Sequence, residues 1–205
     1  MQHRITIIDY GMGNIKSVEN AFNYLGAATF VTRKPAEVIS AETLVLPGVG
    51  AFRSAMLSLG KLGLVEAIQE TVMAKRTKIL GICLGMQLMG TVGAEGGATS
   101  GLGFIPMRVE KIDNSSGIKI PHVGFNEVLP AEKSFLMRGL VGRPDFYFLH
   151  SYRMGCELLP GTVSTCFYGE TFAAAYENEN VFATQFHPEK SQTNGLQLLK
   201  NFLSY

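Results

Sequence analysis

The sequence has no run of like charges, and across its 205 residues the formal net charge at pH 7 is only +1. Bulk electrostatic attraction to nucleic acid or to a membrane surface is therefore not expected. Cysteine is also scarce: Cys83, Cys156 and Cys166 are the three present, and they form no C-x-x-C motif. An odd number of cysteines without that spacing argues against a disulfide framework or a zinc site, and it indicates reduced thiols in the cytoplasm.

Long apolar stretches, internal repeats and low-complexity linkers are absent as well. No segment is long and apolar enough to span a bilayer, and the N-terminus enters a strand pattern without the features of a signal peptide. Hydrophobic residues make up 46% and charged residues 17% of the chain, a composition typical of a globular protein with a sizeable core. We therefore expect a single domain over residues 1–205, located in the cytoplasm.

What the sequence does contain is a change of pattern along its length. In the first half, apolar strand candidates at residues 4–9, 28–31, 43–46 and 78–80 alternate with helical spacings. This alternation predicts an α/β fold with a mostly parallel central sheet covered on both faces. The second half contains short strand candidates separated by turns, at residues 104–109, 146–150, 163–167, 173–176 and 181–185. We expect mixed or antiparallel pairing there, followed by a last helix near the C-terminus.

A cysteine flanked by glycines follows the strand candidate at residues 78–80. Gly81, Cys83 and Gly85 have the G-x-C-x-G spacing of a nucleophile elbow, a strand-turn-helix corner that exposes a reactive side chain at the edge of a sheet. The Leu84 amide then falls in the first helical turn, where free N–H groups and the helix dipole favour a thiolate or an oxyanion. A lone intracellular cysteine is more often a buried structural residue, so the elbow alone does not establish a nucleophile.

A His-Pro-Glu sequence near the C-terminus supplies the missing partner. His187 can act as the base that forms the thiolate, and Glu189 can orient the imidazole, with Pro188 fixing the backbone between them. Taken alone, this motif is equally well explained by a surface histidine beside a solvated ion pair. Combined with the Cys83 elbow, it predicts a catalytic triad.

Two further features fit a site around Cys83. Residues 47–50 read Pro-Gly-Val-Gly at a strand end, and such glycines can adopt positive φ and leave N–H groups free for an oxyanion hole. This segment can equally be an ordinary strand-to-helix turn. Gln87 lies one helical turn beyond Cys83 on the same face, where it can bind a substrate amide or carboxylate, although it can also be helix filler.

These motifs resemble those of the class I, triad-type glutamine amidotransferases. The resemblance rests on residues 81–87 and 187–189, and it extends over essentially the whole chain through residues 8–14, 46–52, 121–124, 150–152 and 185–192. It implies a flavodoxin-like, three-layer fold and the hydrolysis of glutamine to glutamate and ammonia. It also implies that Cys83 is the nucleophile, His187 the base and Glu189 the carboxylate that orients the base.

The resemblance assigns further residues to the site. It implies an oxyanion hole built from the amides of Gly50 and Leu84, which is completed when residues 47–50 turn over. Neither a cofactor nor a metal is implied. The residues implied to contact glutamine are Gly48, Gln87, Ser151 and Tyr152.

The sequence leaves two alternatives for the enzyme that accepts the ammonia, one for each of two branches of this family. In one, the glutaminase forms a heterodimer with a (β/α)8-barrel cyclase that makes imidazole glycerol phosphate in histidine biosynthesis. In the other, it supplies a sugar amidotransferase of surface-polysaccharide biosynthesis. This chain has Phe125 where the cyclase branch carries a tryptophan near its partner, which keeps the aromatic ring but loses the indole N–H. Two further hypotheses are a stand-alone cysteine hydrolase and a binding module in which Cys83 is structural.

Overall fold

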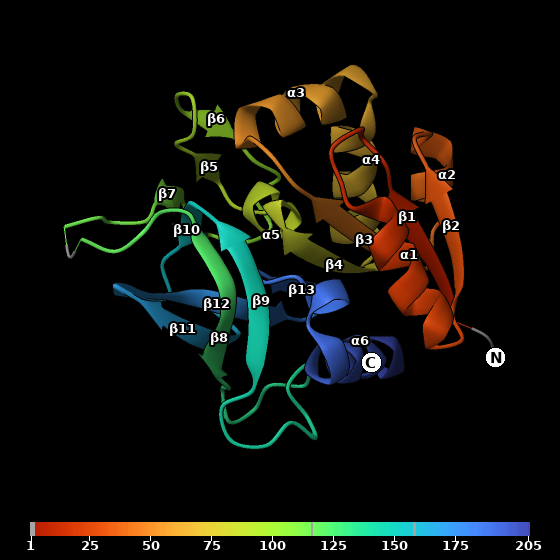
Figure 1. The fold of residues 1–205 in the computed structure, drawn as a ribbon. Coiled ribbons are helices and arrows are strands. Elements are labelled where there is room, and N and C mark those ends of the chain that lie inside the picture. The colour runs from red at the N-terminus through yellow and green to blue at the C-terminus, as the bar shows by residue number, and fades with distance from the viewer. Residues whose placement is uncertain (1–2, 116, 158) are drawn as a thin grey trace.

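A computed structural model of the chain describes residues 3–115, 117–157 and 159–205. Within these residues, nine strands form one large sheet that has helices on both faces (Figure 1). In spatial order the strands are β2 (Ala28–Thr32), β1 (Arg4–Ile8), β3 (Thr43–Gly48), β4 (Lys78–Cys83), β13 (Val181–Thr184), β12 (Glu170–Asn178), β11 (Thr162–Tyr168), β8 (His122–Leu129) and β9 (Asp145–His150).

The direction of the strands changes at β13. From β2 to β13 all neighbours are parallel, whereas from β13 to β9 all neighbours are antiparallel. The two halves of the sheet therefore pair as the two halves of the sequence predict. The parallel strands are nearly continuous apolar runs because helices bury both of their faces.

Two hydrophobic clusters cover the two faces of this sheet. In one cluster, α1 (Ile15–Tyr24) and α6 (Gln192–Ser204) bury their apolar sides, and the rings of Phe22 and Phe202 meet edge to face at 6.4 Å between centroids. Ile7 and Ile8, adjacent in β1, belong to different clusters because successive side chains of a strand point to opposite faces. The other cluster is contributed by α2 (Pro35–Ile39), α3 (Phe52–Lys61), α4 (Leu64–Gln69), the π-helical η1 (Glu70–Ala74) and α5 (Leu84–Leu88).

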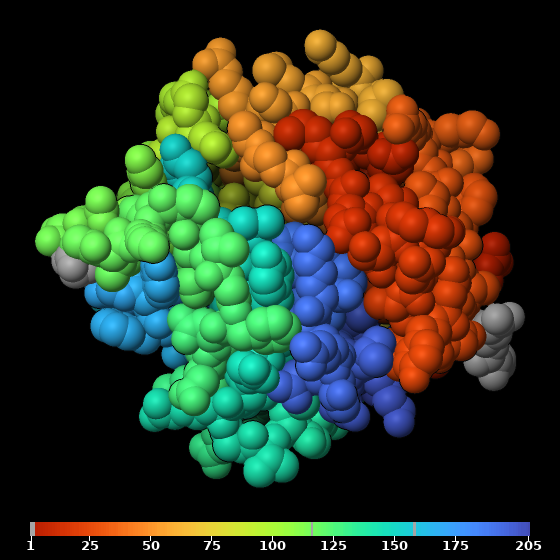
Figure 2. Space-filling model, viewed as in Figure 1, coloured from red at the N-terminus to blue at the C-terminus, as the bar shows by residue number. Residues whose placement is uncertain are grey.

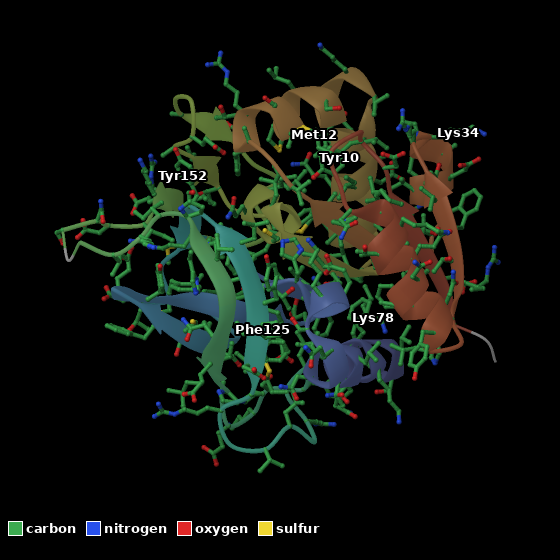
Figure 3. All side chains as sticks on the ribbon, viewed as in Figure 1. Tyr10, Met12, Lys34, Lys78, Phe125 and Tyr152 are labelled. Carbon is green, nitrogen blue, oxygen red and sulfur yellow. The ribbon has the colours of Figure 1, made fainter. Side chains whose placement is uncertain are left out.

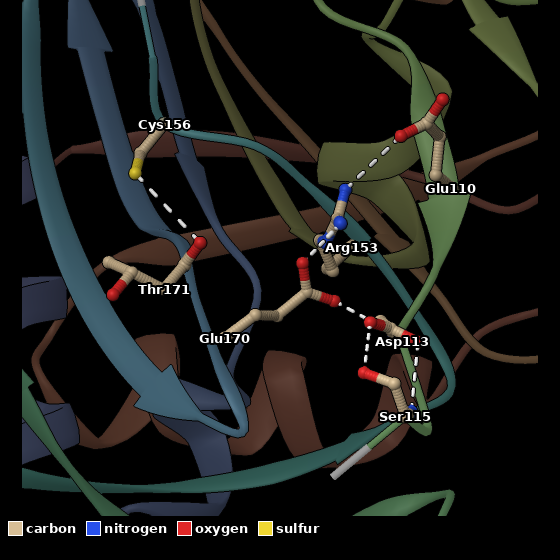
Figure 4. Close-up of polar contacts among 7 residues, drawn as sticks. All are labelled: Glu110, Asp113, Ser115, Arg153, Cys156, Glu170 and Thr171. Carbon is tan, nitrogen blue, oxygen red and sulfur yellow. Dashed lines mark hydrogen bonds and ion pairs between the residues drawn. The ribbon is translucent and has the colours of Figure 1, made fainter.

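A second, smaller sheet lies beside the large one and contains β10 (Tyr152–Met154), β7 (Val109–Lys111), β5 (Val92–Gly93) and β6 (Thr99–Ser100), in that order. Arg153 on β10 joins the two sheets, because it forms ion pairs with Glu110 on β7 at 3.4 Å and with Glu170 at the start of β12 (Figure 4). The other oxygen of Glu170 accepts a hydrogen bond from the Asp113 N–H at 2.9 Å. The Arg153 side chain is only 14% exposed, and its ion pairs link β10 to β7 and to β12.

The strand expected at residues 104–109 is wrong for residues 104–108, and only Val109 belongs to a strand. Pro106 has no N–H with which to join a ladder. The segment instead closes over the end of α5, where the Ile105 N–H donates to the Met89 carbonyl at 2.9 Å. Ile105 is therefore buried, and Phe104 and Met107 are partly buried, without being in a strand.

The strand β8, which carries Phe125, is not indicated by the sequence pattern. Gly124, at φ +124°, interrupts the apolar run. Val123 and Phe125 point outwards and are 55% and 47% exposed. Packing in the hydrophobic core therefore does not explain why these two positions are apolar. Elsewhere in the fold, no helix of the described residues is long and apolar enough to cross a membrane.

Candidate active site

Cys83 is the last residue of β4 and directly precedes α5, at the corner that the G-x-C-x-G spacing predicts. Its backbone adopts φ 53° and ψ −108°, a conformation that costs a non-glycine residue about 1–3 kcal/mol. The flanking glycines allow the close packing of this corner. A Cβ at Gly85 would lie 1.7 Å from the Leu46 carbonyl oxygen, and a Cβ at Gly81 would lie 2.8 Å from the Met89 side chain. The elbow therefore holds Cys83 in one strained orientation.

His187 and Glu189 follow β13, the strand that pairs with β4, and this pairing brings them to Cys83. His187 Nδ1 lies 2.8 Å from Glu189 Oε1, and the two side chains are 2% and 1% exposed. His187 itself is extended, and Pro188 begins a short 3-10 turn, η2 (Pro188–Lys190). Ser191 Oγ donates to the His187 carbonyl at 2.6 Å, which ties this turn to the start of α6.

The charges around His187 favour its protonated form. Burial by itself lowers the pKa of His187, but its interactions with Cys83 and Glu189 outweigh burial and raise that pKa to about 10. Because Nδ1 is bound to Glu189, the buried Nε2 is the nitrogen available to Cys83, and it makes no other hydrogen bond within the described residues. The site is therefore arranged for an imidazolium with its second nitrogen available to Cys83.

Gln185 belongs to the segment 185–192 noted in the sequence, which assigned it no role beside Cys83. Its side-chain nitrogen approaches Cys83 Sγ at 3.7 Å, and its side-chain oxygen accepts from Gln87 Nε2 at 3.0 Å. Gln87 Nε2 also donates to the Tyr152 carbonyl at 2.8 Å. The amide nitrogen of Gln87 is thus fully engaged, which leaves its oxygen for a ligand. The position of Gln185 two residues before His187 is a signal in the sequence, but that position alone does not show its contact with Cys83.

Two buried histidines continue this network away from the nucleophile. His150 Nδ1 lies 2.9 Å from the Tyr152 carbonyl, which can only accept, so His150 carries its proton on Nδ1. Its Nε2 therefore accepts from His122 Nδ1 at 3.1 Å, and His122 Nε2 accepts from Asn126 at 3.2 Å. Burial lowers the pKa of His122 to about 4 and that of His150 to about 3, so both are neutral near pH 7.

A cavity of about 360 Å³ opens at Cys83. Glu95 lines it too, although its glycine-rich loop gives no sequence signal, and its Oε2 accepts from the Phe52 N–H at the start of α3 at 2.8 Å. Gly48 does not line the cavity, and the Tyr10 hydroxyl occupies the space that a side chain at Gly48 would need. The sequence-predicted site residues that line the cavity are Gly50, Cys83, Leu84, Gln87, Ser151 and Tyr152.

The Pro-Gly-Val-Gly segment does not turn its central amide towards this cavity. The Val49 N–H donates at 3.2 Å to the carbonyl of Met12, in the turn between β1 and α1, and Met12 does not line the cavity. Gly50, at φ +102°, is exposed at the rim. The segment must therefore rearrange before the Val49 N–H can face Cys83.

The cysteines are all free thiols. Burial raises the pKa of Cys166 to about 12, which makes it a poor nucleophile. Cys156 packs against the second hydrophobic cluster, and its Sγ lies 4.0 Å from the Thr171 carbonyl, near the Arg153 ion pairs (Figure 4). Among the residues that the structure describes, no group of three or more His, Cys, Asp or Glu side chains could hold a metal ion.

Comparison with known proteins agrees with this geometry. The family model of class-I glutamine amidotransferases matches residues 6–204. The chain is 45% identical over 201 residues to the imidazole glycerol phosphate synthase subunit HisH 1 of Campylobacter jejuni (strain RM1221), covering 97% of this chain and 98% of the relative. It is 46% identical over 198 residues to the imidazole glycerol phosphate synthase subunit HisH of Moorella thermoacetica, covering 97% and 93%.

Solved structures share the fold at low sequence identity. PurLQS from Thermotoga maritima superposes with a TM-score of 0.73 at 18% identity, covering 100% of this chain and 99% of that chain. The glutaminase domain of Trypanosoma brucei CTPS, solved with bound acivicin, gives a TM-score of 0.65 at 16% identity, covering 99% and 94%. At such identities, the likeness concerns the three-layer architecture alone.

Proposed function

This chain belongs to the class-I glutamine amidotransferases, and from that premise we propose that it hydrolyses glutamine to glutamate and ammonia for a partner enzyme. The observation that carries the proposal is Cys83 at a strained elbow, beside the buried His187–Glu189 pair and open to a cavity. The family match over residues 6–204 supports treating the whole chain as one catalytic domain. Family membership also weighs against a stand-alone cysteine hydrolase and against a module with a purely structural Cys83.

The first half of the reaction releases ammonia. The Cys83 thiolate attacks the side-chain carbonyl carbon of glutamine, and the carbonyl electron pair moves to oxygen to give a tetrahedral oxyanion. The His187 imidazolium donates its Nε2 proton to the departing nitrogen, so that ammonia leaves and a glutamyl thioester remains. Glu189 holds the imidazole in the tautomer and orientation that this transfer needs.

The second half regenerates the enzyme. Neutral His187 takes a proton from a water molecule as the water oxygen attacks the thioester carbon, which forms a second tetrahedral oxyanion. Collapse of this intermediate breaks the carbon–sulfur bond, which frees the Cys83 thiolate and gives the γ-carboxylic acid, and this acid loses its proton to water to become glutamate. His187 is then an imidazolium again, and its pKa of about 10 makes that state stable at neutral pH.

The oxyanion in both steps needs preorganised donors. We assign this role to the Leu84 amide together with the amides of Val49 and Gly50 once residues 47–50 have turned over, and each missing donor of this kind costs about 10²–10³ in turnover. The Val49 N–H is held by the Met12 carbonyl, and from this we infer that residues 47–50 have not yet turned over into the arrangement that the oxyanion hole needs. We therefore expect slow hydrolysis until residues 47–50 turn over.

Polar groups around the cavity match the polar ends of glutamine. We assign Gln87, through its free oxygen, together with Ser151 and Tyr152, to glutamine binding. Glu95 adds a carboxylate that complements the α-ammonium group. Gly48 lies opposite Cys83 in the register of β3 and β4, so its contact with glutamine would require the same rearrangement as the oxyanion hole.

We assign the ammonia to a cyclase of histidine biosynthesis. The support is the pair of relatives named as imidazole glycerol phosphate synthase subunits, at 45% and 46% identity over nearly the full chain. In this proposal the chain forms a heterodimer with a (β/α)8-barrel cyclase that uses the ammonia to make imidazole glycerol phosphate. The same relatives favour this pathway over supply of a sugar amidotransferase.

The outer face of β8 and β9 is the surface that we assign to the cyclase. Val123 and Phe125 on β8 point the same way as Leu149 on β9, which pairs with Val123 and is 39% exposed. Figure 3 labels Phe125 on β8. In Figure 2, which has the same view, the green atoms of this part of the chain lie at the surface. Because the Leu149 carbonyl lies 3.7 Å from Cys83 Sγ, this apolar row approaches the nucleophile.

The test is the release of glutamate from glutamine by the folded chain, alone and mixed with a barrel cyclase and its nucleotide substrate. We expect rapid release only in the complete mixture. A folded protein that releases no glutamate under either condition would contradict the glutaminase assignment. Stimulation by a sugar amidotransferase but not by the cyclase would keep the chemistry and change the pathway.

A further inference from the structure

The Tyr10 hydroxyl is a buried polar group near the site that the mechanism above does not use. Tyr10 follows β1 and is 2% exposed, and its hydroxyl makes no hydrogen bond within the described residues. Buried polar groups in native proteins are nearly always paired, because an unpaired one loses its hydration without compensation. The hydroxyl is therefore expected to find its partner in another state of the protein.

The position of this hydroxyl is specific. A Cβ at Gly48 would lie 2.1 Å from the Tyr10 oxygen, 3.0 Å from Leu84 Cβ and 3.2 Å from the Gly85 nitrogen. Gly48 is in turn the register partner of Cys83. The hydroxyl thus lies between the two segments assigned to the oxyanion hole, and the charge of Cys83 adds to burial in raising the pKa of Tyr10.

The geometry of one peptide group connects Tyr10 to the rearrangement. The Gly48 carbonyl and the Val49 N–H belong to the same planar trans peptide, so they point in opposite directions. The N–H now points at the Met12 carbonyl, which belongs to the same turn as Tyr10 (Figure 3). When the peptide turns over to bring the N–H to the cavity, the Gly48 carbonyl swings towards that turn, where the Tyr10 hydroxyl is unpaired.

We propose that Tyr10 is a positioning residue whose hydroxyl donates to the Gly48 carbonyl once residues 47–50 have adopted the catalytic arrangement. The Met12 carbonyl holds the resting arrangement, and the Tyr10 hydroxyl stabilises the catalytic one. This inference rests on the proposed glutaminase function and deepens its activation step. Removing the hydroxyl takes no hydrogen bond from the resting state, so Tyr10→Phe is expected to fold normally.

The experiment uses a probe that reports on the oxyanion hole without any partner. L-Glutamate γ-semialdehyde places an aldehyde where glutamine has its amide. The Cys83 thiolate adds to the aldehyde carbon, the carbonyl electron pair moves to oxygen, and the resulting hemithioacetal oxyanion occupies the hole. Iodoacetamide alkylates the same thiolate by displacing iodide at a saturated carbon, so it needs no oxyanion donor and controls for the reactivity of Cys83.

The variants are Tyr10→Phe and the matched control Tyr176→Phe. Tyr176 is also fully buried on β12, and its hydroxyl makes no hydrogen bond of ordinary geometry within the described chain, although an interaction with the Asn178 side chain lowers its pKa. After burial, the charge that raises the pKa of Tyr176 is that of Glu179 and not that of Cys83. The two substitutions therefore remove the same group in the same kind of environment, one beside the site and one not.

We expect Tyr10→Phe to weaken semialdehyde inhibition about three- to tenfold, the effect of one neutral hydrogen bond. Cyclase-stimulated kcat for glutamine should fall by a similar factor with little change in KM. The melting temperature should not fall, the iodoacetamide rate should stay within about twofold, and Tyr176→Phe should match the wild type in every assay.

Semialdehyde inhibition of Tyr10→Phe equal to that of the wild type would overturn the inference. So would a loss that Tyr176→Phe shares or that follows a lower melting temperature, because Tyr10 would then be a packing residue only. Failure of the proposed function looks different, since the wild type itself would neither bind the semialdehyde nor hydrolyse glutamine. That result would overturn both proposals.

Discussion

His187 Nδ1 and Glu189 Oε1 lie 2.8 Å apart, although the two residues are separated only by Pro188 and both side chains are almost completely buried. A neutral imidazole in that position would leave the carboxylate without a counter-charge in a dry environment, which is unfavourable. The pair therefore favours the imidazolium and directs its other nitrogen towards Cys83. This contact orients the proposed base and, together with Cys83, favours its protonated form.

Substitution within this pair should separate the two roles. His187→Asn removes the group that carries the proton and should lower glutamine turnover by about 10²–10⁴. Glu189→Gln keeps the hydrogen-bonding shape but removes the charge that stabilises the imidazolium, so we expect more residual activity. Steady-state glutamate release in the presence of the cyclase measures the order. A Glu189→Gln variant less active than His187→Asn would require the roles to be reassigned.

The strain at the elbow predicts a difference between two inactive variants. Cys83→Ala and Cys83→Gly should both abolish hydrolysis, because each removes the nucleophile. Cys83 adopts φ 53°, which glycine accepts without penalty, so Cys83→Gly should escape about 1–3 kcal/mol of strain that Cys83→Ala retains. Thermal melts should place the glycine variant at or above the alanine variant. Near-normal hydrolysis by folded Cys83→Ala would end the nucleophile assignment.

The buried histidine pair predicts a loss of stability in mild acid. The pKa values of His122 and His150 are lowered from 6.5 to about 4 and about 3, so below pH 6.5 the unfolded chain binds more protons than the folded one. Above about pH 6.5 this histidine pair does not lower the free energy of unfolding. Below that pH the free energy of unfolding falls as the pH decreases towards 4. Because the pKa of His187 is raised, His187 lowers the free energy of unfolding as the pH rises above 6.5. The measurement is therefore made below pH 6.5, where this contribution is constant.

Urea denaturation at several pH values between 6.5 and 4.5 measures this slope. His150→Gln is the control, because glutamine can still donate to the Tyr152 carbonyl and accept from His122 but does not titrate. We expect the variant to be less stable at pH 6.5 but to lose less stability on acidification. Identical pH slopes for the two proteins would contradict the burial of His150 as a neutral group.

The apolar row on β8 predicts a docking defect. Phe125→Asp should weaken binding of the cyclase by about 2 kcal/mol or more, which is about 30-fold in Kd, because exposed aromatic anchors dominate such interfaces. Phe30→Asp is the matched control, since Phe30 is 51% exposed on β2, in the part of the large sheet opposite to β8. Titration of each variant with the cyclase gives Kd, and melting curves check the fold. Equal loss in both variants would remove β8 from the interface.

The sequence alone determined those features of the site that depend on residues close together in the chain. The spacing of Gly81, Cys83 and Gly85 predicts the elbow because strand, turn and helix start are set by neighbours in the chain. His187 and Glu189 are likewise only two residues apart in the chain, so their contact was predictable from the sequence. Alternation of apolar runs and helical spacings was sufficient to predict the parallel half of the sheet. In the second half, the residues around Pro106 were wrongly assigned to a strand, and the strand β8 around Gly124 was not predicted.

Only the tertiary structure decided how distant segments meet around Cys83. Gln185 reaches Gln87 because β13 is inserted beside β4, and no local pattern encodes that neighbour. The turn after β1 packs against the end of β3. This packing places the Met12 carbonyl where it accepts from the Val49 N–H, and it leaves the Tyr10 hydroxyl unpaired within the described residues. Such contacts join residues far apart in the chain, so their hydrogen-bond partners follow from strand order and packing rather than from spacing in the sequence.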